Sequence, residues 1–305
     1  MGNFSRRNFL QSSAILPFAF KDFCQSVAKP TPLLSFSTLG CPEWDFTKVL
    51  EFAVSNHYNG IELRGIKGQL NLPECNEFNS PVHIAETKKI IADKGLKIVD
   101  LGSSTELHHT ESDGRQKQLD SGKRFIDLAA AINCPYIRVF PNKLPDGDER
   151  KKVIDLIISG LIELGDYAGK TGVTVLMESH GDAVKTEELK YIMHNAENSR
   201  TGLVWDIVNM WAVTKLPPAE VYAQLKKYIR HTHIKDLQFN GDKIKYVLLG
   251  TGVTPIFDAI DLLYKDGYKG YYSFEWEKLW HPEIDAPEIA LADYPKKMRA
   301  HFKQF

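Results

Sequence analysis

This chain of 305 residues lacks the marks of several protein classes. Its four cysteines, Cys24, Cys41, Cys75 and Cys134, include no close pair, which argues against a disulfide scaffold or a thiolate zinc site. The formal net charge is −1, so there is no general attraction to nucleic acid or to an anionic membrane. Beyond the N-terminal segment, no run approaches the ~20 uninterrupted apolar residues of a membrane span. The glycine-rich phosphate-binding motifs are also missing, which disfavours an open, doubly wound nucleotide-binding sheet.

The N-terminal segment is predicted to be an export signal. The run SRRNFL at 5–10 resembles a twin-arginine signal, and a mildly apolar stretch and a small-residue cleavage site at Ser26-Val27-Ala28 follow it. A basic amphipathic helix is the alternative interpretation. The export interpretation assigns residues 1–28 to the signal and 29–305 to the catalytic domain. It also predicts passage through the twin-arginine machinery to a bacterial periplasm, with no stable membrane insertion.

Apolar strand-like runs alternate with longer amphipathic segments after Pro30. Strands are expected near 33–37, 59–64, 96–101, 135–140, 173–178, 202–206, 229–235 and 270–276. Helices are expected near 45–56, 81–94, 115–133, 149–171, 186–196, 217–228, 255–266 and 287–303. Eight strand-plus-helix units predict an α/β fold of one domain, a closed (β/α)8 TIM barrel. Segment 237–249, with its turn at Asn240-Gly241-Asp242, predicts a small β-hairpin after the seventh strand.

Four ionisable residues lie at or near the ends of four successive predicted strands: Glu178, Asp206, His233 and Glu275. Their intervals are 28, 27 and 42 residues, and the third falls to 29 without the 13 residues of the hairpin. These values are close to the roughly 31 residues of one barrel unit, so the four side chains are expected at the same end of the barrel. Any one acidic residue could be a solvated loop or cap residue. Together, three carboxylates and an imidazole predict a site for one divalent metal ion, manganese or magnesium first, with zinc, cobalt or iron as alternatives.

Side chains two residues apart on a strand share a face, which extends the predicted site. His180 follows Glu178 by two positions, Lys235 follows His233, and Arg64 follows Glu62, so His180, Lys235 and Arg64 are predicted to contact substrate. The alternatives are a buried ion pair between Arg64 and Glu62 and a loop ion pair between Lys235 and Asp236.

Two further residues after the last predicted strand are candidate substrate contacts. Trp276 and His281 are expected to form an apolar wall and a polar tip over the pocket, as aromatic faces do for sugar rings. Core packing is the alternative for the tryptophan. His231, two residues before His233, is expected to face inward and to support a ligand.

The segments LMESHGD, VWDIVN, HTHIKD and FEWE together resemble the xylose-isomerase-like barrel superfamily, in its sugar isomerase and epimerase group. The resemblance covers essentially the whole chain after the signal and implies that Glu178, Asp206, His233 and Glu275 bind one metal ion. Asn209 stands where the apurinic endonucleases and ketose epimerases of this superfamily place a histidine. That difference argues against a DNA-repair enzyme and makes Asn209 a candidate substrate contact.

The predicted chemistry is proton transfer at a carbon next to a carbonyl of a sugar or keto-sugar. The metal would stabilise an enediolate, and Glu178 and Glu275 would act as base and acid in an isomerase or epimerase. A lyase or dehydratase that acts on oxidised sugars or glycosides by the same proton removal is an alternative. An exported, non-catalytic carbohydrate-binding barrel is an alternative of another class. Homo-oligomerisation is left open.

Overall fold

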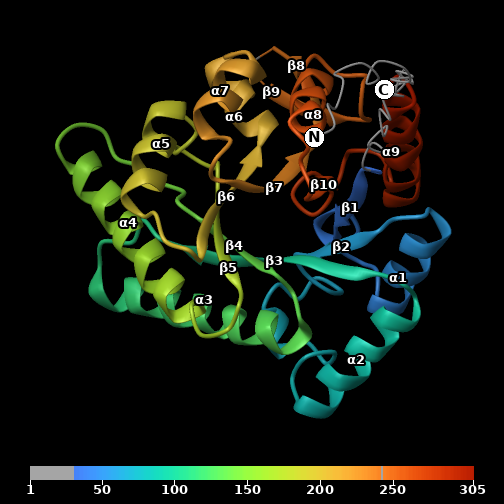
Figure 1. Cartoon of the computed structure of the whole chain (residues 1–305), viewed down its shortest axis with the longest axis horizontal. Helices are drawn as coiled ribbons and strands as arrows, with labels where there is room; N and C mark the ends of the chain where they lie inside the picture. The colour runs from blue at the N-terminus through green and yellow to red at the C-terminus, as the bar shows by residue number, and fades with distance from the viewer. Residues whose placement is uncertain (1–30, 242) are drawn as a thin grey trace, which may run out of the picture. The chain divides into compact units, whose positions relative to one another are not determined.

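Eight parallel strands close into a barrel in the computed structural model, which describes residues 31–241 and 243–305. Around the barrel the strands follow chain order from β1 to β7, and β10 closes the ring between β7 and β1 (Figure 1). They are β1 (Leu33–Ser37), β2 (Gly60–Leu63), β3 (Lys97–Glu106), β4 (Tyr136–Phe140), β5 (Thr174–Glu178), β6 (Thr201–Asp206), β7 (Ile229–Ile234) and β10 (Tyr271–Phe274). The predicted TIM barrel is confirmed. The predicted export signal lies outside the described residues.

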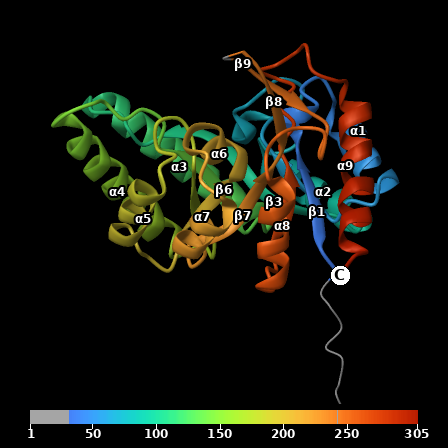
Figure 2. The same ribbon diagram turned by 90° about the horizontal axis from the view of Figure 1, so that it is seen from above.

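Helices connect the strands on the outside of the barrel. They are α1 (Phe46–Ser55), α2 (Pro81–Asp93), α3 (Ser112–Ile132), α4 (Glu149–Ala168), α5 (Thr186–Asn195), α6 (Ile207–Thr214), α7 (Pro218–Leu225), α8 (Ile256–Lys265) and α9 (Pro287–Phe302), with short 3-10 turns at Thr38–Gly40 and Leu72–Glu74. The last helix, α9, lies beside α1 (Figure 2), where Lys48 and Glu288 form an ion pair of 2.9 Å. Within the described ranges, none of these helices combines the length and apolar content that crossing a bilayer requires.

Local sequence signals account for several of the helix ends. The side chain of Asp45 accepts a hydrogen bond from the Lys48 amide and begins α1, and Ser80 does the same for His83 in α2. Asn133, with a φ of 61°, ends α3 in the left-handed conformation that asparagine tolerates. The segment missed by the sequence prediction is α6, which starts directly after β6 because Asp206 is both the last strand residue and the N-cap.

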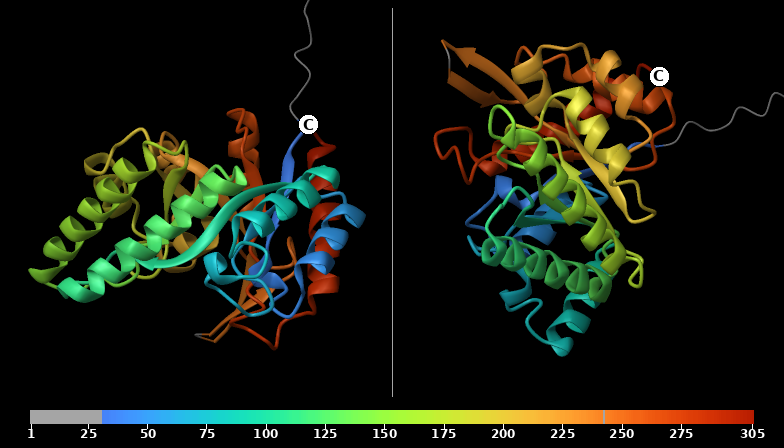
Figure 3. Two further views of the ribbon diagram at one scale, coloured as in Figure 1. Left: turned by 90° about the horizontal axis from the view of Figure 1, so that it is seen from below. Right: turned by 90° about the vertical axis from the view of Figure 1, so that its left-hand side faces the viewer.

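The predicted hairpin is confirmed as β8 (Asp236–Asn240) and β9 (Lys243–Val247), which pair antiparallel. It projects from the barrel body beside the ends of the strands (Figure 3). One carboxylate organises its base, because Asp236 Oδ2 accepts hydrogen bonds from the amides of Gly250 and Gly252, each at 2.9 Å. The hairpin therefore leaves the barrel from a fixed point next to β7.

The barrel interior is unusually polar. Each barrel strand contributes a buried polar side chain that is at most 1% exposed, and these are Ser35, Glu62, Asp100, Arg138, Glu178, Asp206, His233 and Ser273. Most TIM barrels fill this space with branched apolar side chains. Buried charges are costly unless they are paired or bind a ligand, so this interior indicates a functional site within the barrel.

Candidate functional site

The four predicted metal ligands converge at the carboxyl end of the barrel. His233 Nδ1 lies 3.1 Å from Glu178 Oε1, 3.2 Å from Glu275 Oε1 and 3.9 Å from Asp206 Oδ2. All four side chains are buried, and their ligand atoms lie within 4.8 Å of one another. Parallel pairing explains the convergence, because it places Asp206 directly opposite His233 in the neighbouring strand. Their role as metal ligands stays a prediction.

The donor atoms of this cluster fit a divalent metal ion. Among the described residues, neither Glu178 Oε2 nor Asp206 Oδ2 accepts an aligned hydrogen bond, although buried polar atoms are normally paired; their close contacts are the charged groups of Arg138, at 3.1 Å, and Lys235, at 2.7 Å. The other oxygen of Asp206 accepts the amide of Asn209 at 2.8 Å and caps α6, which fixes the orientation of the carboxylate. Carboxylate oxygens with one imidazole suit manganese, magnesium, zinc and iron(II).

Glu62 orients the imidazole of His233 by contacting its Nε2 atom. Its Oε2 lies 3.1 Å from His233 Nε2 and 2.9 Å from His231 Nε2, and it accepts a hydrogen bond from Ser273 Oγ at 3.0 Å. Burial opposes ionisation of Glu62, but the charge of His233 and the two imidazole hydrogen bonds outweigh it, so the pKa of Glu62 falls well below its usual range. An ionised Glu62 favours the proton of His233 on Nε2 and leaves Nδ1 facing the carboxylates of Glu178, Asp206 and Glu275. His231 faces inward as predicted.

Lys235 forms a second centre of charge beside the cluster. Its Nζ lies 2.7 Å from Asp206 Oδ2, 2.5 Å from Glu275 Oε2 and 2.6 Å from Glu277 Oε1. Burial alone would lower the pKa of Lys235, but these three carboxylates raise it well above its ordinary value. The alternative loop pair with Asp236 is wrong, because that carboxylate accepts backbone amides instead.

Two arginines, Arg64 and Arg138, lie side by side on the other side of the barrel. Arg138 Nε is 3.1 Å from Glu178 Oε2, though the N–H is not aligned for a hydrogen bond. The Arg64 guanidinium donates to the Gly102 carbonyl at 3.4 Å and to Ser104 Oγ at 2.9 Å. The alternative ion pair between Arg64 and Glu62 is wrong, since Glu62 is engaged by the two histidines.

His180 follows the end of β5 and is held at the mouth of the barrel. Its Nδ1 lies 2.7 Å from Asn142 Oδ1, and Asn142 in turn donates to Glu106 Oε1. The imidazole packs against Phe140 at a ring-centroid distance of 4.5 Å. Burial lowers the pKa of His180, so the neutral form is favoured.

The structure places the remaining predicted contacts differently. The side chain of Asn209 reaches the Ser179 carbonyl at 3.5 Å, at the end of β5. His281 lies beside Tyr246 of the hairpin, at a ring-centroid distance of 5.0 Å. The prediction that Trp276 forms a wall of the pocket is wrong. Because it follows Glu275 by one residue, its indole points out of the barrel, stacks on Phe274 at 5.7 Å and is fully buried.

Sequence reasoning missed three residues near the cluster. Arg138 stands in the apolar strand run PYIRVF, where a charged residue is itself a signal of function. Glu277 follows Glu275 by two positions, so strand alternation could have predicted it. Tyr246, whose ring centroid is 5.5 Å from Lys235 Nζ, carries no such signal, because only the fold of the hairpin brings it there.

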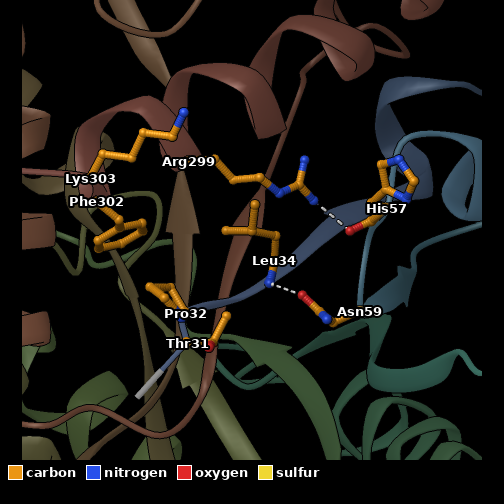
Figure 4. Close-up of a pocket in the computed structure, with 8 residues that line it drawn as sticks. All are labelled: Thr31, Pro32, Leu34, His57, Asn59, Arg299, Phe302 and Lys303. Carbon is orange, nitrogen blue, oxygen red and sulfur yellow. Dashed lines mark hydrogen bonds between the residues drawn. The ribbon is translucent and has the colours of Figure 1, made fainter. Parts of the chain in front are cut away.

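A separate cavity of about 370 Å³ lies at the opposite end of the barrel (Figure 4). Its lining includes Leu34 of β1, His57 and Asn59 before β2, and Arg299 and Phe302 near the end of α9. Arg299 is already engaged by the carbonyl of His57. None of the described residues that line this cavity carries a carboxylate, and it lies at the amino ends of the strands, so it is not the candidate site.

Fold and cluster together define a TIM barrel with a candidate metal site at the carboxyl ends of its strands. Residues 50–296 match the family model of the xylose isomerase-like TIM barrel, and the chain belongs to this family.

Two similar curated proteins are dehydratases. An inosose dehydratase of Geobacillus thermodenitrificans is 26% identical over 170 residues, which cover 49% of this chain and 54% of that protein. A 3-dehydroshikimate dehydratase of Bacillus anthracis is 21% identical over 228 residues, which cover 70% of this chain and 78% of that protein. The chain therefore spans about half the length of the first relative.

Solved structures with the same fold include an epimerase and a zinc-bound protein. The IOLI protein with a bound zinc atom has a TM-score of 0.75 and 18% identity, covering 90% of this chain and 99% of its own. The 3-keto-D-glucoside 4-epimerase YcjR of E. coli has a TM-score of 0.69 and 15% identity, covering 88% of this chain and 100% of its own. At these identities the likeness shows the fold.

Proposed function

We propose that this protein is a divalent-metal-dependent enzyme that removes a proton from the carbon next to a carbonyl of a sugar or keto-sugar, in an isomerisation or epimerisation. The observation that carries the proposal is the buried convergence of Glu178, Asp206, His233 and Glu275 on four successive strand ends. Membership of a family with metal-binding, epimerase and dehydratase relatives supports it.

The chain's own residues supply the proton transfers. When bound, the metal ion stabilises the negative charge that develops on the carbonyl oxygen. Glu178 ends β5 and Glu275 follows β10, the two strands on either side of the β6–β7 pair, so one carboxylate can remove the proton and the other can return it. His180 offers a further proton acceptor, because the contact of its Nδ1 with Asn142 leaves Nε2 available.

Dehydration is the second candidate reaction, and the position of Lys235 favours it. After removal of the α-proton, the C–H electron pair forms a C=C bond and a hydroxyl group on the β-carbon leaves. The carboxylate that removed the α-proton can pass it to that hydroxyl, so water departs, and the positive charge of Lys235, held among Asp206, Glu275 and Glu277, can stabilise negative charge on the leaving oxygen. Both curated relatives are dehydratases, which supports the same reaction.

Proton exchange in deuterated water tests the proposal and separates the two reactions. Metal-loaded protein, with its metal content verified by elemental analysis, is incubated with a panel of keto-sugars and with two cyclic hydroxyketones, inosose and 3-dehydroshikimate. Epimerisation is expected to place deuterium on the α-carbon, whereas dehydration yields an unsaturated product. Glu275→Gln should lower the rate by roughly 100-fold or more. The matched control is Glu220→Gln, at an exposed carboxylate in the first turn of α7.

Tight binding without exchange or product across the panel would contradict catalysis and favour a carbohydrate-binding barrel. An unchanged rate in Glu275→Gln would remove that residue from the proton transfer.

A further inference from the structure

Arg64 is a buried cation at the edge of the site. Arg64 is the first residue after β2, and it is only 5% exposed to solvent. One end of its guanidinium donates to the buried Gly102 carbonyl, and the other donates to the hydroxyl of Ser104, an exposed residue. The group therefore lies between the barrel interior and the open mouth, where a substrate enters.

Within the part of the chain that the structure describes, this cation has no counter-ion in contact. Among the described residues, no carboxylate oxygen lies within 4.0 Å of its nitrogens. The nearby carboxylates each contact another charged or imidazole group through one oxygen: Glu62 Oε2 contacts the two histidines, Glu178 Oε2 contacts Arg138, and Glu275 Oε2 contacts Lys235. Burying an unpaired charge costs free energy, and a bound ligand of opposite charge would offset that cost.

The packing around Gly102 makes room for this arginine. A Cβ atom at Gly102 would lie 2.8 Å from Arg64 Cδ and 3.0 Å from Arg138 Nη2, so a larger residue there would displace the two arginine side chains. Burial and the like charge of Arg138 lower the pKa of Arg64 to about 9, which still leaves it charged at neutral pH. Its two hydrogen bonds leave most of the guanidinium donors available for a ligand.

We propose that Arg64 is an anion-binding subsite and that the substrate is a keto acid whose carboxylate binds this arginine. The inference rests on the proposed function and names its substrate class. A planar carboxylate matches the guanidinium fork with two parallel hydrogen bonds. A phosphate group offers the same oxygens, but its second negative charge would lie near Glu178 and Glu275 with only one unpaired cation to balance it.

A matched set of three ketoses tests the subsite: D-fructose, D-fructuronate and D-fructose 6-phosphate differ only at the terminal carbon. Their affinities for the metal-loaded protein are measured by calorimetry. We expect wild-type protein to bind fructuronate at least about tenfold more tightly than fructose. This ratio should fall close to one in Arg64→Gln and take an intermediate value in Arg64→Lys, which keeps the charge but loses the fork.

Controls separate the subsite from general damage. Arg124→Gln, at an exposed arginine of α3, should leave the ratio unchanged. Metal affinity should persist in Arg64→Gln, which shows that the barrel has folded. Gly102→Ala, which keeps both arginines but crowds them, should reduce the ratio as well.

A ratio close to one in the wild type, or a ratio unchanged in Arg64→Gln, overturns the subsite. Tighter binding of the phosphate than of the carboxylate overturns the keto-acid assignment. If fructuronate binds through Arg64 and no ketone of the wider panel exchanges its α-proton, the proposed function fails while the subsite stands. If exchange occurs and is independent of Arg64, the subsite alone fails.

Discussion

At the scale of single residues, the carboxylates of the site have two oxygens with different partners. Asp206 uses Oδ1 to cap α6 and turns Oδ2 toward His233 and Lys235. Glu275 turns Oε1 toward His233 and Oε2 toward Lys235. Glu62 uses one oxygen for three hydrogen-bonding groups. Each of these carboxylates is therefore held in one orientation by a neighbour, as the proposed metal site requires.

Replacing Glu62 tests this orienting role. Glu62→Gln keeps the size of the side chain but removes the charge that holds the His233 proton on Nε2. We expect metal affinity to fall by roughly 10- to 100-fold, measured by calorimetry with manganese or zinc. The control is Glu43→Gln, at an exposed residue before α1. An affinity equal to that of the control would show that His233 needs no support from Glu62.

At the scale of elements, strand register and strand ends build the site. β7 alone provides His231 and His233, and Lys235 follows it directly. Its pairing with β6 places Asp206 opposite His233, and its pairing with β10 places Ser273 opposite the same histidine. The hairpin then brings Tyr246 over Lys235. A shift of one residue in β7 would turn all three side chains out of the barrel.

The base of the hairpin depends on Asp236. Replacing this residue tests whether the hairpin opens independently of the barrel. Asp236→Ala leaves the amides of Gly250 and Gly252 without their acceptor. We expect the free energy of local unfolding of this segment to fall by about 1–3 kcal/mol, while the rest of the barrel keeps its stability. Hydrogen exchange should speed up over 236–254 and stay unchanged in β5 and β6, with the exposed Asp146→Ala as control. Faster exchange throughout the barrel would show that the segment is not a separate unit.

At the scale of the whole molecule, residues Thr31–Phe305 form one unit around a charged interior. Glu62, Glu178, Asp206 and Glu275 are buried together, and a bound divalent ion would offset part of their mutual repulsion. Because every barrel strand reaches into this interior, the state of the site is coupled to the stability of the entire barrel.

Metal removal is therefore expected to lower the thermal stability of the protein. At free metal of about 100 times the dissociation constant, binding contributes about 2.7 kcal/mol. Chelation should then lower the Tm by roughly 5 to 8 °C, measured by calorimetry or circular dichroism. Asp206→Asn, which loses a ligand charge, should show little change on chelation. Equal shifts in both proteins would mean that the chelator acts elsewhere.

Much of the architecture could be predicted from local patterns. The runs of apolar residues and the spacing of the four candidate ligands predict the barrel and its functional end, because strand ends in a regular repeat share one side. The prediction that Trp276 lines the pocket fails for a local reason, since a residue next to an inward Glu275 must point outward. The helix α6 was missed because one aspartate serves as strand end, cap and candidate ligand at once.

The sequence by itself determined the eightfold repeat, the hairpin and the residue types that meet at the barrel's mouth, because each depends on periodicity along the chain. Only the tertiary structure decided the partners of the charges: Lys235 with Asp206, Glu275 and Glu277, and Arg64 with no carboxylate in contact among residues 31–241 and 243–305. Electrostatic and hydrogen-bonding partners are set by distances of a few ångströms between residues far apart in the chain. Those distances exist only once the barrel has closed.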